Sequence, residues 1–221
     1  MEAIRTSQVA TFANGCLLGS DTIITYITTD SRDVREGCLF AAIKGDRFDG
    51  HSFINQAYAA GAACVLSQTE VSIPAGKSAI IVGDTRKALL NIAGGYRRMF
   101  NIPVVAITGS VGKTTTKDIV AEVLSKRFNV LKTIGNFNND IGVPKTIFSL
   151  GIEHNAAVIE MGMNHKGEID TLARSVSPDI GIITNVGVSH IENLGSREGI
   201  LDAKCEMFSH IDPLLATIVL S

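Results

Sequence analysis

The chain of 221 residues is 45% hydrophobic and 19% charged, with 21 glycines and 5 prolines. This composition is typical of a folded globular protein and excludes a disordered or collagen-like chain. Its 20 basic and 22 acidic residues leave a formal net charge of −2, so no overall field draws it to nucleic acid or to an anionic membrane. No apolar run reaches the roughly 18–20 residues of a membrane-spanning helix.

The N-terminal part of the sequence alternates short helices with short strands. Apolar and β-branched runs between turn residues predict strands, and amphipathic runs bounded by Asn, Gly or Pro predict helices. The predicted helices span 6–13, 51–60 and 86–99, and the predicted strands span 23–28, 38–43, 63–67 and 79–82. The polar turn TDSRDVREG joins the first two strands, and together these elements predict a small α/β domain.

A change of pattern at Asn101-Ile102-Pro103 predicts a boundary between domains 1–100 and 101–221. Beyond it, strands and helices alternate as in βα units, which predicts a mostly parallel sheet flanked by helices. The predicted strands are 104–108, one starting at 130, 156–161, 180–184 and 216–220, and the predicted helices are 113–128, 143–150, 168–176 and 196–210. In the helix 113–128 the residues expected to face inward are Ile119, Val120, Val123 and Leu124.

The N-terminus and the cysteines predict a cytoplasmic protein. The segment MEAIRTSQVATFANG carries Glu2 and lacks the apolar core of a signal peptide. Cys16, Cys38, Cys64 and Cys205 stand apart, without the CxxC or His spacing of a metal site. We therefore expect reduced thiols, with Cys38 and Cys64 as small core residues in apolar runs.

The most specific motif is the glycine-rich loop TGSVGKTT, which follows an apolar strand and opens an amphipathic helix. Its glycines let backbone N–H groups turn toward an anion, and the helix N-terminus adds partial positive charge. Lys113 is spaced to reach β/γ-phosphates and Thr114 to hold Mg²⁺. The usual first glycine of the motif is Ile107 in this chain, and a glycine turn without a ligand is the alternative. The predicted phosphate-binding residues are Thr108, Gly109, Ser110, Val111, Gly112, Lys113, Thr114 and Thr115.

Two ionisable residues follow later predicted strands. Glu160 ends the strand 156–161, and His190 lies in the loop after 180–184. Ligands of parallel α/β sheets bind at the carboxyl ends of the strands, so Glu160 is expected to hold Mg²⁺ and His190 to reach the same site. A solvated acid and a structural histidine are the alternatives.

Lys204 lies on the apolar face of the predicted helix 196–210. This position predicts either a lysine that extends its ammonium group to water or one adapted to a buried role. The residues that share its face in the prediction are Ile200, Leu201 and Phe208.

Five motifs in this order resemble the Mur ligase family of peptidoglycan synthesis: TGSVGKTTT, GNFNNDIGVP, EMGMNHKGEI, TNVGVSHIENLGS and ILDAKCEMF. They cover most of residues 104–208, and an ordered set is far more specific than any one motif. The segment TDSRDVREGCLFAAIKGDRFDGHSF resembles the family's UDP-sugar-binding domain. This segment and the EMG and GEI elements favour the branch that adds D-Ala-D-Ala to UDP-N-acetylmuramoyl-tripeptide.

The resemblance implies an ATP- and Mg²⁺-dependent ligase that forms an amide bond through an acyl phosphate. In the family pattern, Lys113 holds the β/γ-phosphates, and Thr114 and Glu160 hold one Mg²⁺. His190, Glu160 and Lys204 hold a second Mg²⁺, and in this pattern the lysine is carbamylated by CO₂. The implied catalytic residues are therefore Lys113, Glu160, His190 and Lys204.

The resemblance also implies contacts to the two larger ligands. Either Asn138 or Asn139 contacts the nucleotide. The UDP-muramoyl-peptide site would contain Ser31, Arg32, Lys44, Gly45, Asp49, Gly50 and His51. Cys205 stands where a small residue such as glycine is common in the family, and nothing in the sequence makes it reactive. A monomer without nucleic-acid or membrane partners is expected.

Members of the family have three domains and are longer than this chain. We therefore expect a complete N-terminal domain, a partial ATP-binding domain without a C-terminal ligase domain, and no activity of the chain by itself. One alternative is another Mur-type amino-acid ligase or a relative of folylpolyglutamate synthase. A second is a non-catalytic fragment that binds a nucleotide or a UDP-sugar. A generic kinase or GTPase has no support, because no HRD or DFG motif is present.

Overall fold

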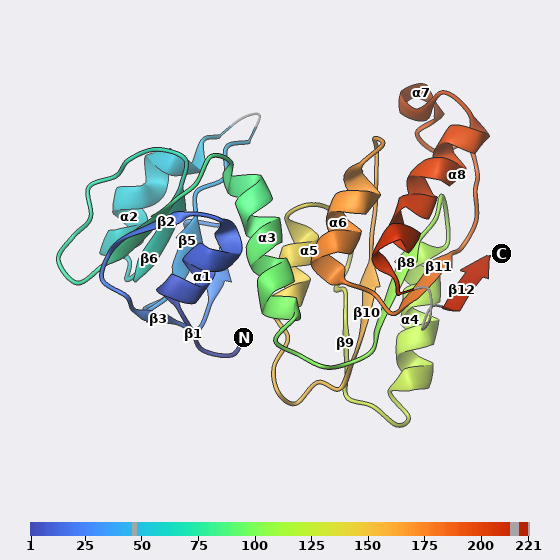
Figure 1. Ribbon diagram of the computed structural model, residues 1–221, viewed down its shortest axis with the longest axis horizontal. Coiled ribbons are helices and arrows are strands. Elements are labelled where there is room, and N and C mark those ends of the chain that lie inside the picture. Colours follow the sequence, from blue (N-terminus) through green and yellow to red (C-terminus); the bar gives the residue numbers. More distant parts are fainter. Residues whose placement is uncertain (46–47, 213–216, 221) are drawn as a thin grey trace. The chain divides into compact units, whose positions relative to one another are not determined.

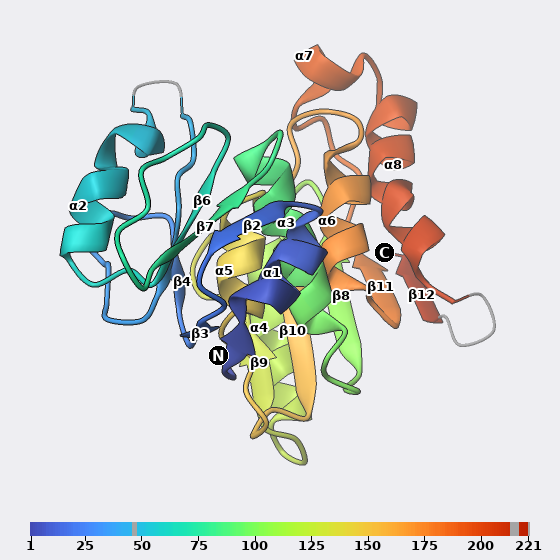
Figure 2. The same cartoon turned by 60° about the vertical axis from the view of Figure 1, so that its left-hand side comes forward.

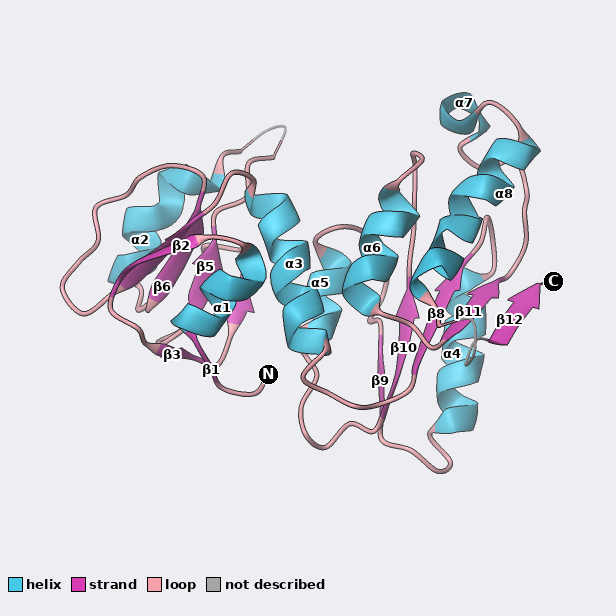
Figure 3. Ribbon diagram, viewed as in Figure 1, coloured by secondary structure: helices cyan, strands magenta, loops and turns pink. Residues whose placement is uncertain are grey.

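A computed structural model of the chain describes residues 1–45 and 48–212 and the backbone of residues 217–220. They form two compact units, Met1–Gly95 and Tyr96–Ser221 (Figure 1). Each unit contains a sheet with helices packed on it (Figure 3), which confirms the predicted α/β class. No helix among the described residues has the length and apolarity to cross a bilayer.

The boundary between the units falls inside helix α3 (Thr85–Arg97) rather than after it. Tyr96 belongs to the second unit because its ring lies edge-on to those of Phe100 and Phe148, with centroids 5.1 and 6.1 Å away. Its hydroxyl donates to the Leu150 carbonyl oxygen at 2.7 Å. The predicted boundary near residue 100 lies later. The turn at Pro103 marks the end of the segment that joins the units, whereas packing against the second unit already begins at Tyr96.

The first unit is built on a five-stranded sheet in the order β2-β7-β6-β5-β4. Its strands are β2 (Cys16–Gly19), β4 (Ile27–Thr28), β5 (Leu39–Ala41), β6 (Cys64–Ser67) and β7 (Ser78–Ile81). Strand β2 is antiparallel to β7, and the other neighbours are parallel. The carboxyl ends of β4, β5 and β6 therefore open at one edge of the sheet.

The single strand predicted over 23–28 is wrong, because two strands with different partners occupy it. Strand β3 (Ile23–Ile24) pairs antiparallel with β1 (Ile4–Arg5), whereas β4 pairs parallel with β5. Between them the Tyr26 carbonyl accepts from the Leu39 N–H at 2.9 Å. A continuous β-branched run carries no signal for such a change of partner.

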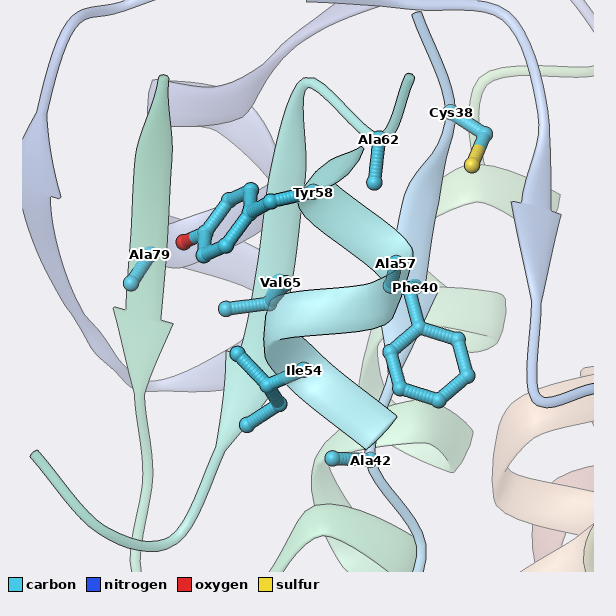
Figure 4. Close-up of a cluster of buried hydrophobic side chains, with 9 residues drawn as sticks. All are labelled: Cys38, Phe40, Ala42, Ile54, Ala57, Tyr58, Ala62, Val65 and Ala79. Atoms are coloured by element: carbon cyan, nitrogen blue, oxygen red, sulfur yellow. The ribbon is translucent and has the colours of Figure 1, made fainter. Parts of the chain in front are cut away.

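The helices of the first unit are α1 (Thr6–Ala13), α2 (Ile54–Ala59), which is preceded by the 3₁₀ turn η1 (Gly50–Phe53), and most of α3. Helix α2 covers one face of the sheet with a buried apolar cluster (Figure 4). In it the Tyr58 hydroxyl donates to the Ser78 carbonyl at 2.8 Å. The cluster consists of Cys38, Phe40, Ala42, Ile54, Ala57, Tyr58, Ala62, Val65 and Ala79. Cys64 is also fully buried, so the core positions predicted for Cys38 and Cys64 are confirmed.

The second unit is built on an all-parallel sheet in the order β12-β11-β8-β10-β9. Its strands are β8 (Val104–Thr108), β9 (Val130–Lys132), β10 (Ala156–Glu160), β11 (Ile180–Ile183) and β12 (Thr217–Leu220). The parallel arrangement confirms the prediction from alternating βα units. The predicted last strand began at Ala216, which lies outside the described residues.

Helices cover both faces of this sheet, with α4 on one face and α6 on the other (Figures 1 and 2). The helices are α4 (Lys113–Leu124), α5 (Gly142–Ile147), α6 (Glu168–Val176), α7 (Ile191–Leu194) and α8 (Arg197–Cys205), which continues as the 3₁₀ turn η2 (Glu206–His210). The predicted helix 113–128 thus ends earlier, and the predicted helix 196–210 changes type after Cys205.

The inward face predicted for α4 is half wrong. Val120 and Leu124 pack against the sheet, but Ile119 and Val123 are 59% and 66% exposed. The buried stripe also includes a lysine, which shifts it away from the most apolar face that the sequence suggests. The stripe runs through Lys117, Val120, Ala121 and Leu124.

We expect Phe40→Ala to lower the free energy of unfolding by ~3–5 kcal/mol, because it opens a cavity in the cluster under α2. Phe40 is 1% exposed, whereas Phe48 is 74% exposed, so Phe48→Ala is the matched control and should cost less than about 0.5 kcal/mol. Urea unfolding measures both. Equal losses from the two variants would contradict the cluster's role.

Candidate active site

Four loops of the second unit meet at one edge of its sheet. Strands β8, β10 and β11 end level with one another, since Ile107 pairs with Glu160 and Thr108 with Ile183. All strands are parallel, so the segments after them emerge at the same edge. These loops are residues 109–112, 133–141, 161–167 and 184–190.

The glycine-rich loop adopts a backbone that side chains would prevent. Gly109 has φ +153°, and a Cβ there would lie 1.9 Å from Thr184 Oγ1. Gly112 has φ +80° and directly precedes α4, whose first N–H groups lack helical acceptors. Lys113 folds back, and its Nζ donates to the Gly109 carbonyl at 2.8 Å. Glycine, lysine and helix N-terminus thus have the arrangement of an anion-binding loop.

Glu160 is the central side chain of the site and is 1% exposed. Its Oε2 accepts from Thr114 Oγ1 at 2.9 Å, and its Oε1 accepts from Asn138 Nδ2 at 2.9 Å. Its backbone N–H donates to Thr133 Oγ1 at 3.0 Å. Burial of a carboxylate is costly unless its oxygens are paired, and here neutral donors from the first turn of α4 and from the loop after β9 pair both.

The structure distinguishes the two asparagines that the sequence left open. Asn138 contacts Glu160, whereas Asn139 Oδ1 accepts from the N–H groups of Ile141 and Gly142 at 3.2 and 2.8 Å, where α5 begins. Asn138 is therefore bonded to the buried carboxylate, and Asn139 stabilises the start of a helix, while the nucleotide contact of either stays a prediction.

Lys204 is buried, with 2% of its surface exposed, so it does not extend to water. Burial, and secondly the positive charge of Lys113, lowers the pKa of its ammonium group to about 8. The predicted apolar face is wrong at Leu201, which is 39% exposed. The buried residues of α8 are instead Ile200, Ala203 and Lys204, and the helix contacts α6, α7 and η2.

Cys205 neighbours Lys204 but is not an activated thiol. It is half-buried and unpaired with another sulfur. Burial is the main cause that raises the pKa of its thiol above the ordinary value. A raised pKa leaves little thiolate at neutral pH, so the structure supports an inert cysteine here.

His190 is less integrated than its sequence position suggested. It precedes α7 with a left-handed backbone, φ 62°. Among the described residues, no hydrogen bond engages its ring, and no three His, Cys, Asp or Glu side chains gather closely enough to hold a metal. Hydrogen bonds therefore join Thr114, Glu160 and Asn138 directly, whereas none among the described residues joins the His190 ring to them.

Sequence reasoning missed two residues of the loop after β11. Asn185 Oδ1 accepts from the N–H groups of Ser110 and Val111 at 3.1 and 2.9 Å. Thr184 Oγ1 donates to the Val111 carbonyl at 2.6 Å. The signal was a Thr-Asn pair directly after a buried strand, at the edge where the glycine-rich loop also begins.

In the first unit, the expected substrate residues line the loops after β4 and β5. Ser31 and Arg32 follow β4, and the guanidinium of Arg32 is paired through two hydrogen bonds, 2.9 and 2.7 Å, with Asp30. The Arg32 side chain is 87% exposed, so an anionic ligand can compete with Asp30 at little cost.

The loop after β5 is held by His51. Its Nδ1 lies 2.6 Å from Asp49 Oδ1, and its Nε2 accepts from the Gln68 N–H at 3.0 Å. An amide N–H can only donate, so Nε2 carries the lone pair and Nδ1 carries the hydrogen. Hydrogen bonds from His51 lower the pKa of Asp49. Both ring nitrogens are thus used within the unit, and His51 fixes this loop to the end of β6.

Three further expected residues belong to the same loop. Lys44 and Asp49 form an isolated antiparallel bridge, and the Gly45 N–H donates to the Phe48 carbonyl at 2.9 Å. A Cβ on Gly50 would lie 2.7 Å from the Ile43 nitrogen. Gly50 therefore permits a close approach of the backbone to Ile43, and Lys44 supplies a positive charge at this edge of the sheet.

Comparison with known proteins gives consistent matches along the chain. Residues 23–113 match the model described as "Mur ligase family, catalytic domain" and residues 107–220 match the "Mur ligase middle domain". The UDP-N-acetylmuramoyl-tripeptide–D-alanyl-D-alanine ligase of Synechocystis sp. is 46% identical over 212 residues, 93% of this chain and 47% of that protein. The chain spans about half the length of the curated relatives it matches.

Solved structures agree with these matches. A crystal structure of MurF from Acinetobacter baumannii is similar with a TM-score of 0.92 and 38% identity, over 99% of this chain and 49% of that one. MurF from Thermotoga maritima in complex with ADP has a TM-score of 0.80 and 31% identity, over 88% of this chain and 49% of that one.

We expect Gly109→Ala to destabilise the second unit by ~1–3 kcal/mol, since an L-residue is strained at this φ and its Cβ would strike Thr184. Gly83 has an ordinary φ and open space around it, so Gly83→Ala is the control and should change stability by less than about 1 kcal/mol. Thermal unfolding measures both. An unchanged melting temperature for Gly109→Ala would contradict the described loop backbone.

Proposed function

The chain belongs to the Mur ligase family, and we propose that it forms the sugar-nucleotide-binding and ATP-binding parts of a ligase that joins D-Ala-D-Ala to UDP-N-acetylmuramoyl-tripeptide. The observation that carries this proposal is the buried Glu160, bonded to Thr114 and Asn138 beside a glycine-rich loop with Lys113. The named relatives act on these substrates, and the Thermotoga maritima relative binds ADP.

The proposed reaction has two displacements. A carboxylate oxygen of the tripeptide attacks the γ-phosphorus of ATP, an O–P bond forms, and ADP leaves as the bond to its β-phosphate oxygen breaks. The amine of D-Ala-D-Ala then attacks the acyl carbon, a C–N bond forms, inorganic phosphate leaves, and the nitrogen loses a proton. Phosphoryl transfer of this kind depends on positioning and charge neutralisation more than on covalent help from the protein.

The glycine-rich loop is proposed to bind the phosphates through residues 108–115. Lys113 is the cation for the β/γ-phosphates, and its Nζ gives up the Gly109 carbonyl for a stronger charge-assisted bond to phosphate. Thr108 Oγ1 is buried without a hydrogen-bond partner among the described residues. An unpaired buried hydroxyl at the start of the loop is consistent with a polar ligand there.

Mg²⁺ is proposed to bind at Thr114 and Glu160. Their hydroxyl and carboxylate oxygens are the hard ligands that Mg²⁺ prefers, and they already face each other at 2.9 Å. When bound, the ion would neutralise charge on the transferred phosphoryl group. Asn138 orients Glu160 from the other side. His190, with Glu160 and Lys204, is proposed to serve a second such site, as the family resemblance implies.

Lys204 is proposed to carry a carbamate. Its buried ammonium group adds a second positive charge near Lys113. No carboxylate among the described residues forms an ion pair with it. Reaction of the neutral amine with CO₂ forms an N–C bond, releases a proton and converts the group to an anion. The anion would face Lys113 and complete an oxygen ligand set, as the family resemblance implies.

The sugar nucleotide is proposed to bind at the edge of the first unit's sheet. Arg32 and Lys44 supply cations there for the anionic diphosphate. Ser31, Gly45, Asp49 and Gly50 shape the two loops. His51 acts as a positioning residue, because both of its nitrogens are already engaged.

The decisive experiment is a phosphate-release assay on the full-length gene product with ATP, Mg²⁺, UDP-N-acetylmuramoyl-tripeptide and D-Ala-D-Ala. We expect release only when all four are present. Lys113→Ala should lower the rate at least ~100-fold because it removes the charge on the phosphates, and Glu160→Gln should do the same.

Lys126→Ala is the control for this assay, since that side chain is exposed and pairs with Glu122 on the surface of the helix end. Its rate should stay within about twofold of the wild type. Release with single amino acids in place of D-Ala-D-Ala would favour another amino-acid ligase. Normal rates in Lys113→Ala would refute the phosphate site.

A carbamate on Lys204 should be visible by ¹³C NMR of the protein in ¹³C-labelled bicarbonate. Only the neutral amine reacts, and the pKa is lowered to about 8, so at constant dissolved CO₂ the signal should be weak below that pH and rise through it. Lys204→Arg keeps the positive charge but cannot form this carbamate, so its spectrum is the control. The assignment fails if the variant retains the signal or the wild type lacks it.

A further inference from the structure

The glycine-rich loop is already occupied by a side chain of the same unit. Asn185 Oδ1 accepts from two successive N–H groups, those of Ser110 at 3.1 Å and Val111 at 2.9 Å. The Asn185 backbone carbonyl also accepts from the Ser110 N–H at 3.2 Å. Successive N–H groups that converge on one oxygen form a nest, the backbone geometry that binds phosphate oxygens in such loops.

The carboxamide oxygen therefore sits where the loop would receive a phosphate oxygen. An N–H group has one hydrogen, so Ser110 and Val111 cannot serve Asn185 and a phosphate fully at once. A phosphate oxygen carries charge and forms the stronger bond. Displacement of the neutral amide is thus favourable but lowers the net affinity for the ligand.

The loop after β11 stays attached when the side chain leaves. Thr184 Oγ1 donates to the Val111 carbonyl at 2.6 Å, the Gly187 N–H donates to Ser110 Oγ at 3.0 Å, and Arg197 donates to the Val186 carbonyl at 2.8 Å. None of these bonds uses the Asn185 side chain. The side chain can therefore swing out while the backbone remains held beside the glycine-rich loop.

We propose that Asn185 is an internal stand-in for phosphate, which holds the nest of the glycine-rich loop in the nucleotide-free protein and is displaced when a nucleotide binds. The inference rests on the proposed nucleotide site. Asn185 thereby couples occupancy of the phosphate site to the segment 185–190, which carries His190. Displacement frees the Asn185 side chain, while the bonds of Thr184 and Gly187 keep the backbone of this segment beside the glycine-rich loop.

A fixed brace is the competing interpretation. In that case Asn185 keeps its bonds to Ser110 and Val111 in the complex, and phosphate contacts only the N–H groups of Gly112 and the first turn of α4. The two interpretations predict opposite effects of the side chain on affinity, because a brace helps binding and a competitor weakens it.

The test is calorimetric titration of the full-length gene product with pyrophosphate and with ADP. We expect Asn185→Ala to bind pyrophosphate ~3–10-fold more tightly than the wild type, since the loss of two neutral hydrogen bonds frees the nest. Asn185→Asp should bind it more weakly by a similar factor, because a carboxylate holds the nest and repels phosphate. Asn193→Ala, an exposed asparagine on α7, is the control and should match the wild type.

Equal or weaker binding by Asn185→Ala would overturn the inference while the proposed function stands. Absence of binding to the wild type, or full binding by Lys113→Ala, would overturn the proposed function and the inference with it. A crystal structure of the wild-type protein with ADP gives a second measurement that needs no variant. Asn185 Oδ1 should then lie outside hydrogen-bond distance of the Ser110 and Val111 nitrogens, and retention of both bonds would refute the displacement.

Discussion

The candidate site depends on one buried carboxylate. Glu160 is 1% exposed, and its two oxygens are stable there because Thr114 and Asn138 donate to them. These bonds tie the segment after β9 and the first turn of α4 to the end of β10. An unpaired carboxylate at this depth would destabilise the unit or become protonated. The Glu160 carboxylate thus both stabilises the fold and is the proposed Mg²⁺ ligand. A bound cation would replace the Thr114 hydroxyl as the partner of its oxygen.

The parallel sheet makes this pairing possible. Strands β8, β10 and β11 end level with one another, so the loops that follow them share one edge. A different functional group lies at each strand end: the backbone N–H groups of the glycine-rich loop after β8, the Glu160 carboxylate at the end of β10, and the Asn185 carboxamide after β11. A shift of one residue in any strand would turn its terminal side chain to the opposite face, so the buried apolar strands fix the site as well as the core.

Positive charge is the second constraint. Burial, and secondly the positive charge of Lys113, lowers the pKa of the Lys204 ammonium group to about 8. Such an arrangement is costly in the free protein, and anionic groups relieve it. Phosphates at Lys113 and a carbamate on Lys204 would both do so. The Asn185 oxygen that fills the nest carries no net charge. The positive charge of the site therefore stays uncompensated until the nucleotide binds.

Local patterns in the sequence determined the α/β class, the parallel order of elements after residue 100, the glycine-rich loop and the identity of Glu160 and Lys204 as unusual residues. They failed where a partner distant in the chain decides the outcome. The division of 23–28 into two strands, the rotation of α4 that exposes Ile119, the different roles of Asn138 and Asn139, and the occupation of the nest by Asn185 all depend on neighbours that only the folded sheet brings close. Hydrophobic period and motif spacing describe contacts within a segment, whereas these features are hydrogen bonds and packing between segments, and those exist only in the tertiary structure.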